Sequence, residues 1–137
     1  MIKKLLLVLS IIILLNEFCA PEKLCNGEDF ILGFKGEFLC QGKPSKTAKF
    51  YVNSCNSETG DCDRTSTTTS NIIGKFFGSS TVKGSNDEFE LHVYHDCAHC
   101  GGASSILFST NDGVNCEGSL GKTHDFGKIE LTDPLYC

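Results

Sequence analysis

The sequence contains no tryptophan, one methionine and three prolines, and its basic residues form no cluster beyond Lys3-Lys4. Affinity for nucleic acid depends on clustered cations, so the sequence predicts no nucleic-acid partner. A long hydrophobic run is also missing, since the longest, from Leu5 to Leu15, covers eleven residues and is interrupted by Ser10. As a helix it would span about 17 Å, against a hydrocarbon core of roughly 30 Å, so no transmembrane segment is expected.

The chain of 137 residues begins with the pattern of a secretory signal peptide. Two lysines precede the apolar run and a more polar dipeptide follows it, as in the three regions of such a peptide. Ala20 is a suitable small residue for the end of a cleaved segment, but Phe18 and Pro21 leave the cleavage site open between about residues 18 and 22. We therefore expect a signal peptide over 1–20, one domain over 21–137, and a secreted, extracellular protein.

Removal of the first twenty residues would leave ten bases and sixteen acids, a net charge of −6, and would also remove Cys19. The remaining even number of cysteines in an exported chain indicates disulfides. Cys55 and Cys62 flank a turn-rich segment and are the expected local pair. The other pairings stay open, because eight cysteines allow about 105 connectivities. The eight are Cys25, Cys40, Cys55, Cys62, Cys97, Cys100, Cys116 and Cys137.

Apolar and polar residues alternate in several short segments, which is the period of half-buried strands. In the first of these, Phe34, Phe38 and Cys40 share one parity, and a turn is expected at Gly42-Lys43-Pro44. The Thr-rich segment 65–70 fits an edge strand as well as a loop. No segment has a helical stripe, so we expect an all-β sandwich of about seven short strands. The expected core contains Phe38, Phe50, Val52, Phe89, Leu91, Val93 and Phe108.

Three of the four histidines, His92, His95 and His99, lie around the Cys97-x-x-Cys100 pair. This cluster suggests zinc, but a structural zinc site usually has a second ligand pair at a set spacing, and here none is present. His92 and His95 would also point to opposite faces of an extended strand. We expect disulfides and no cofactor, and a metal-binding secreted protein remains an alternative.

Catalytic motifs are weak throughout the chain. The segment Gly118–Gly121 lacks the spacing of a nucleophile elbow, and His124-Asp125 would need a nucleophile that the sequence does not name. The acidic segment Glu58–Asp63 continues without the glycine of a calcium loop. The sequence therefore predicts no catalytic residues and no enzyme.

Four motifs together resemble the nematode transthyretin-like family from about Gly33 to Leu131. They are Gly36–Pro44 (GEFLCQGKP), Gly74–Ser79 (GKFFGS), Tyr94-His95-Asp96-Cys97, and Asp125–Leu131 (DFGKIEL). The resemblance implies a secreted, disulfide-stabilised, prealbumin-like Greek-key β-sandwich of seven to eight strands. It also implies a bond from Cys40 to Cys97 or Cys100. The cysteines at 55, 62, 116 and 137 go beyond the family pattern.

The resemblance further implies an extracellular binding or recognition module whose ligand is an apolar small molecule, a lipid or a cell-surface protein. Related enzymes hydrolyse 5-hydroxyisourate and end in a Tyr-Arg-Gly-Ser tail, whereas this chain ends in Leu135-Tyr136-Cys137 and its one arginine, Arg64, is expected in an acidic loop. Because this chain lacks that tail, a binding module is the expected function and a hydrolase of this type is the alternative. The expected binding surface consists of the loops 58–63, 96–102 and 113–122, and the net charge makes anionic membrane lipid the less favoured partner.

Overall fold

The computed structural model describes residues 2, 4, 22–69, 71, 73–100, 102–108 and 112–137. The expected signal peptide thus lies outside the described residues, apart from Ile2 and Lys4. The described part forms nine strands and one short 3-10 turn, and it contains no helix with the length and hydropathy needed to cross a membrane. The elements are η1 (Leu24–Gly27), β1 (Phe30–Cys40), β2 (Lys43–Pro44), β3 (Lys49–Cys55), β4 (Cys62–Thr69), β5 (Lys75–Val82), β6 (Glu88–His95), β7 (Gly102–Phe108), β8 (Val114–Asn115) and β9 (His124–Glu130).

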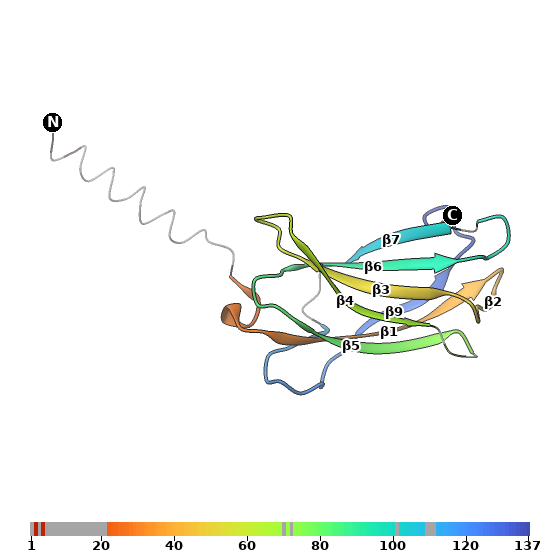
Figure 1. The fold of residues 1–137 in the computed structure, drawn as a ribbon, viewed down its shortest axis with the longest axis horizontal. Helices are drawn as coiled ribbons and strands as arrows, with labels where there is room; N and C mark the ends of the chain where they lie inside the picture. Colours follow the sequence, from red (N-terminus) through yellow and green to blue (C-terminus); the bar gives the residue numbers. More distant parts are fainter. Residues whose placement is uncertain are drawn as a thin grey trace.

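Two sheets lie one above the other (Figure 1). In one of them β1 pairs with β2, β5 and β8 in antiparallel orientation and with β9 in parallel orientation. The other sheet is antiparallel with the order β4-β3-β6-β7. Along the chain β3 and β4 are followed by β5 in the opposite sheet, and β6 then returns beside β3, which is a Greek-key connection. The expected all-β Greek-key sandwich is confirmed.

Phenylalanine rings fill the space between the sheets. All seven residues expected in the core are buried. Phe50 of β3 contacts Phe34 and Phe38 of the facing strand β1, with ring centroids 5.8 Å apart in both pairs. Period-2 alternation therefore identified the buried face of β1, β3 and β6, because an antiparallel sheet with one solvated face places every second residue inside.

Four disulfides join the eight cysteines from Cys25 onwards. Cys55–Cys62 is the local pair that the turn-rich spacing predicts, and Cys40–Cys97 is one of the two pairings that the family resemblance implies. Cys25–Cys116 ties the segment before β1 to the end of β8, and Cys100–Cys137 ties the loop after β6 to the C-terminus. All cysteines that could have bound zinc are thereby used as disulfides.

The first turn differs from the expectation by about one residue. It consists of Gln41 and Gly42, which have φ values of 52° and 74°, while Lys43 and Pro44 already form β2. Two central residues with positive φ are characteristic of the type I′ hairpin turn. The Glu130 carboxylate accepts hydrogen bonds from the backbone N–H of Gln41 at 2.9 Å and of Gly42 at 2.8 Å. This distant carboxylate fixes the turn, and the local sequence could not reveal it.

Arg64 also lies elsewhere than expected. It is part of β4, which begins at Cys62, whereas the sequence placed it in an acidic loop. Pairing with β3 extends β4 to Thr69, so the Thr-rich segment is an edge strand, and Ser70 lies outside the described residues. The acidic residues near Arg64 concealed this strand, because charged residues are depleted in strands but tolerated at exposed edges.

Two glycines lie opposite phenylalanines and leave space for their rings. Phe34 lies opposite Gly78 and Phe76 lies opposite Gly36 in the β1–β5 ladder, and each ring covers the facing glycine. A methyl group on Gly78 would overlap the Phe34 ring.

We expect Gly78→Ala to lower the free energy of unfolding by about 1 to 3 kcal/mol, the usual cost of overpacking a core. Urea denaturation monitored by tyrosine fluorescence measures it. Ser79→Ala, at an exposed position on the same strand, is the matched control and should change stability by less than about 0.5 kcal/mol. Equal stability of the Gly78 variant and the wild type would show that the Phe34 ring does not occupy this space.

Candidate functional site

The motif Tyr94-His95-Asp96-Cys97 lies where β6 ends. Tyr94 is exposed on the outer face of its sheet, while His95 and Cys97 are buried. The His95 imidazole contacts the backbone N–H of Cys97 through Nδ1 and the carbonyl oxygen of Tyr136 through Nε2, at 3.4 Å each. With the nearby Cys100–Cys137 bond, this part of the motif holds the C-terminal segment against the sandwich.

The three clustered histidines do not meet. His92 faces outward, where its Nε2 lies 2.8 Å from the Glu90 carboxylate, and His95 is buried at the end of the same strand. His99 is exposed in the following turn. Within the part of the chain that the structure describes, no three His, Cys, Asp or Glu side chains are placed to hold a metal ion.

The three loops expected to form one binding surface lie at two ends of the sandwich. Cys55 pairs with Glu88, so the loop after β3 lies at the end where β6 begins, and the loop 96–102 lies at the opposite end. The loop 113–122 joins the first group, because β8 pairs with the start of β1. The expectation of a single loop-built surface is wrong, since the alternating strand directions separate the loops.

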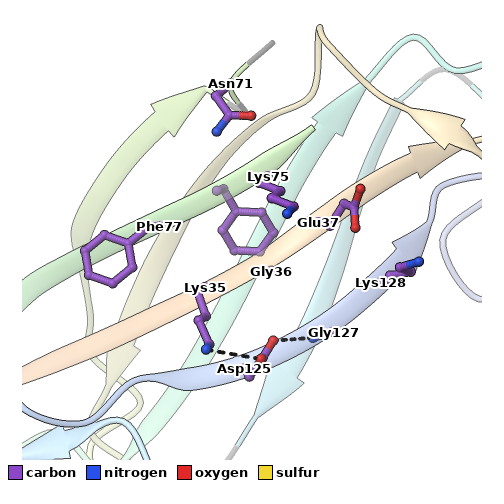
Figure 2. Close-up of a pocket in the computed structure, with 10 residues that line it drawn as sticks. Lys35, Gly36, Glu37, Asn71, Lys75, Phe77, Asp125, Gly127 and Lys128 are labelled. Carbon is purple, nitrogen blue, oxygen red and sulfur yellow. Dashed lines mark hydrogen bonds and ion pairs between the residues drawn. The ribbon is translucent and has the colours of Figure 1, made fainter. Parts of the chain in front are cut away.

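A groove of about 430 Å³ lies instead on the outer face of the sheet formed by β1, β5 and β9 (Figure 2). Its size is within the usual range of small-molecule sites. The groove is lined by Lys35, Gly36, Glu37, Asn71, Lys75, Phe76, Phe77, Asp125, Gly127 and Lys128.

A β-bulge in β9 shapes the groove. The register shifts between Lys35 and Glu37, so that Phe126 and Gly127 together lie opposite Gly36. Gly127 has a φ of 65°, which an L side chain rarely adopts. The extra residue places Phe126 and Ile129 on the inner side although they are three positions apart, and the side chains of Asp125 and Lys128 consequently line the groove.

One ion pair lies along the groove. The Asp125 carboxylate accepts a hydrogen bond from the backbone N–H of Gly127 at 2.8 Å and lies 3.4 Å from the Lys35 ammonium group. The Gly127 hydrogen bond, together with the charge of Lys35, holds the pKa of Asp125 below its ordinary value. Asp125 is therefore ionised at neutral pH, and it neutralises Lys35.

Two other lysines of the groove, Lys75 and Lys128, lie on the strands to either side of Glu37. Lys75 pairs with Glu37 in the β1–β5 ladder, and Figure 2 shows these side chains on neighbouring strands with Lys128 on β9. Among the described residues, neither Lys75 nor Lys128 has a carboxylate within 4 Å of its ammonium group. Phe77 is 60% exposed and lies opposite Lys35 in the β1–β5 ladder, at the other end of the groove from Lys128 (Figure 2). The groove therefore combines an aromatic surface with two ammonium groups that have no salt-bridge partner among the described residues.

The sequence predicted none of the groove residues as a site. Three of the family-like motifs contain most of these residues, but the only role considered for one of them was that of Asp125 as the partner of His124. In the structure His124 turns inward and stacks on Phe108 with ring centroids 5.2 Å apart. Phe77 gave a signal of its own in the sequence, because it follows the buried Phe76 and must lie on the opposite face of the strand.

Comparison with known proteins gives no family assignment. The sequence matches no family model and no curated protein. Among solved structures, the chain is similar to part of a 9R-lipoxygenase from Cyanothece PCC8801, with a TM-score of 0.48 and 16% identity. The alignment covers 81% of this chain and 17% of the lipoxygenase chain, and at this level of similarity it carries no argument about activity.

Proposed function

We propose that the protein is a secreted binding module of the transthyretin-like type, and that the groove over β1, β5 and β9 takes an apolar small molecule carrying an acid group. The observation that supports this most is that the exposed Phe77 lies at one end of the groove and Lys128 at the other, with Lys75 between them (Figure 2), and that neither lysine forms a salt bridge within the described part of the chain. An apolar body would cover the ring and the alkyl parts of the lysines, since lysine stems themselves present apolar surface. The acid group would contact the ammonium groups.

Secretion is the second part of the proposal. Four disulfides in a domain of this size are typical of proteins from oxidising compartments. The pattern of residues 1–20 supports the same compartment. A net charge of −6 would repel anions at a distance, so the acid group must be held by short-range contacts within the groove.

A binding role is favoured over 5-hydroxyisourate hydrolysis by the composition of the groove. No histidine or arginine stands among the described residues that line it. His92, His95 and Arg64 belong to strands of the other sheet. Lysines and carboxylates alone would bind an acid but would offer no imidazole to move a proton.

The test uses the mature oxidised protein with dodecanoate, below its micelle concentration, as the probe and dodecanol, below its solubility limit, as the uncharged counterpart. We expect the double variant Lys75→Gln/Lys128→Gln to bind dodecanoate about tenfold more weakly, because an ion pair at an exposed site is worth up to about 1 kcal/mol and the variant removes two. Its affinity for dodecanol should change little. Phe77→Ser should weaken both probes.

Lys43→Gln removes one positive charge from the exposed β2 and is the matched control. Displacement of a fluorescent fatty acid measures all affinities. If the wild type fails to bind either probe, or if Lys43→Gln weakens dodecanoate binding as much as the groove variant does, the groove is not the ligand site.

A further inference from the structure

A stack of three flat side chains lies on the outer face of the other sheet. The Arg64 guanidinium of β4 covers the Tyr51 ring at 3.8 Å from its centroid. On β6, the His92 ring is stacked on Tyr51 with an interplanar angle of 9° and a centroid distance of 4.7 Å. Because β3 lies between β4 and β6, the two groups approach Tyr51 from either side and bury it on a solvated face.

The Arg64 guanidinium is held in place without an acidic partner. Its neighbour Asp63 lies 3.0 Å from the Lys83 ammonium group, and Glu90 on the same face contacts His92 at 2.8 Å. In the part of the chain that the structure describes, Arg64 itself forms no salt bridge. A planar guanidinium fixed by stacking presents its N–H edge for bidentate contact with an oxyanion.

Two tyrosine hydroxyls extend this polar edge. The hydroxyl oxygens of Tyr51 and Tyr94 are 3.3 Å apart, so they share one proton in a hydrogen bond and the second proton can be donated to a ligand. Hydrogen bonding to Tyr51 raises the pKa of Tyr94, and the charge of Arg64 acts against that rise. Because the guanidinium covers the Tyr51 ring and the Tyr51 hydroxyl contacts that of Tyr94, the guanidinium and the hydroxyl pair can bind one group together.

A shallow hollow of about 550 Å³ lies beside Tyr94, whose ring is 46% exposed. Small residues face Tyr94 from β7, where its direct partner is Ala103. On the rim are the Lys49 ammonium group and Asp96, whose carboxylate accepts a hydrogen bond from the Thr47 hydroxyl at 2.6 Å. An aromatic wall with a rim of charged and hydroxyl groups matches a sugar ring, which has an apolar face and polar edges.

We propose that this face binds the acidic end of a glycan. The carboxylate or sulfate group of the sugar lies on Arg64 and the tyrosine hydroxyls, and the sugar ring lies on Tyr94 in the hollow. Among the described residues, Glu88, Glu90 and Asp96 are carboxylates on this face; Glu88 lies at the start of β6, away from Tyr94, Glu90 is paired with His92, and Asp96 accepts hydrogen bonds from the sugar hydroxyls. This site is separate from the groove, because the two lie on the outer faces of opposite sheets.

Calorimetric titration of the mature oxidised protein with three saccharides tests the proposal: sialyllactose for a carboxylate, a heparin-derived disaccharide for a sulfate, and lactose as the neutral probe. We expect at least one acidic saccharide to bind and lactose to bind at least tenfold more weakly. Arg64→Gln should weaken the acidic saccharide about tenfold. Arg64→Lys should also weaken it, because an ammonium group offers no planar fork.

Tyr94→Phe removes one hydroxyl from a different strand and should weaken binding several-fold while keeping the ring. Urea denaturation of each variant shows whether it is folded. If the arginine variants are unfolded, Tyr94→Phe still tests the proposal. Lys43→Gln, the matched charge control, should bind like the wild type. Any one of three results overturns the proposal. Neither acidic saccharide binds, or lactose binds as tightly as they do, or a tetraglutamate peptide, which tests for an acidic protein partner, binds more tightly than both acidic saccharides.

Discussion

Replacing Phe89 with alanine is expected to lower the free energy of unfolding by about 3 to 5 kcal/mol, the range for deleting a buried aromatic ring. Phe89 is 1% exposed on β6. Its ring meets Phe30 of the facing sheet edge-on at 6.2 Å and Phe108 of β7 at 5.7 Å between centroids. Truncation would leave a cavity between the two sheets that these neighbouring rings could fill only in part.

Urea denaturation of the oxidised protein measures the effect. Phe77→Ala is the matched control, because the same ring is removed from a largely exposed position and should cost less than about 1 kcal/mol. A loss below 1 kcal/mol for Phe89→Ala would mean that this ring is at the surface and that β6 has a different register.

The second large effect concerns the disulfides and depends on loop length. Cys25–Cys116 closes a sequence separation of 91 residues, whereas Cys55–Cys62 closes 7. Because a disulfide stabilises mainly by restricting the unfolded chain, we expect Cys25→Ser/Cys116→Ser to cost about 4 kcal/mol and Cys55→Ser/Cys62→Ser about 2 kcal/mol.

Denaturation of the two double variants under oxidising conditions compares these costs. Thiol titration of the denatured, unreduced protein without residues 1–20 should find no free thiol, which establishes that all four bonds are present at the start. A larger cost for the short loop than for the long one would contradict this ranking.

Local patterns in the sequence predicted the interior of the sandwich well. Period-2 alternation is a property of neighbouring residues, so Phe50, Val52 and Leu91 could be assigned to the core without knowing their partners. The Cys55–Cys62 pair followed from a short turn-rich segment. These features need no information about how distant strands meet.

Both candidate sites depend on distant strands, so the sequence named several of their residues but could not show which of them meet. The groove brings Lys35, Lys75 and Lys128 together through the parallel pairing of β1 with β9, the first long strand with the last. The bulge at Gly127 also interrupts the alternation of inward and outward side chains along β9, so a strict period of two could not place Lys128 on the same face as Asp125. Arg64 was assigned to a loop because its neighbours are acidic, and only the pairing of β4 with β3 shows that it covers Tyr51.

An apolar acid bound on the outer face of β1, β5 and β9 would change the surroundings of the backbone amides along the groove. Titration of ¹⁵N-labelled mature protein with dodecanoate, followed by two-dimensional NMR, tests it most directly. We predict that amide shifts concentrate at Gly36, Phe77 and Gly127, while His92 and Tyr94 on the opposite sheet stay unchanged. Shifts confined to the opposite sheet or to the end loops, or no shifts at all, would contradict the account.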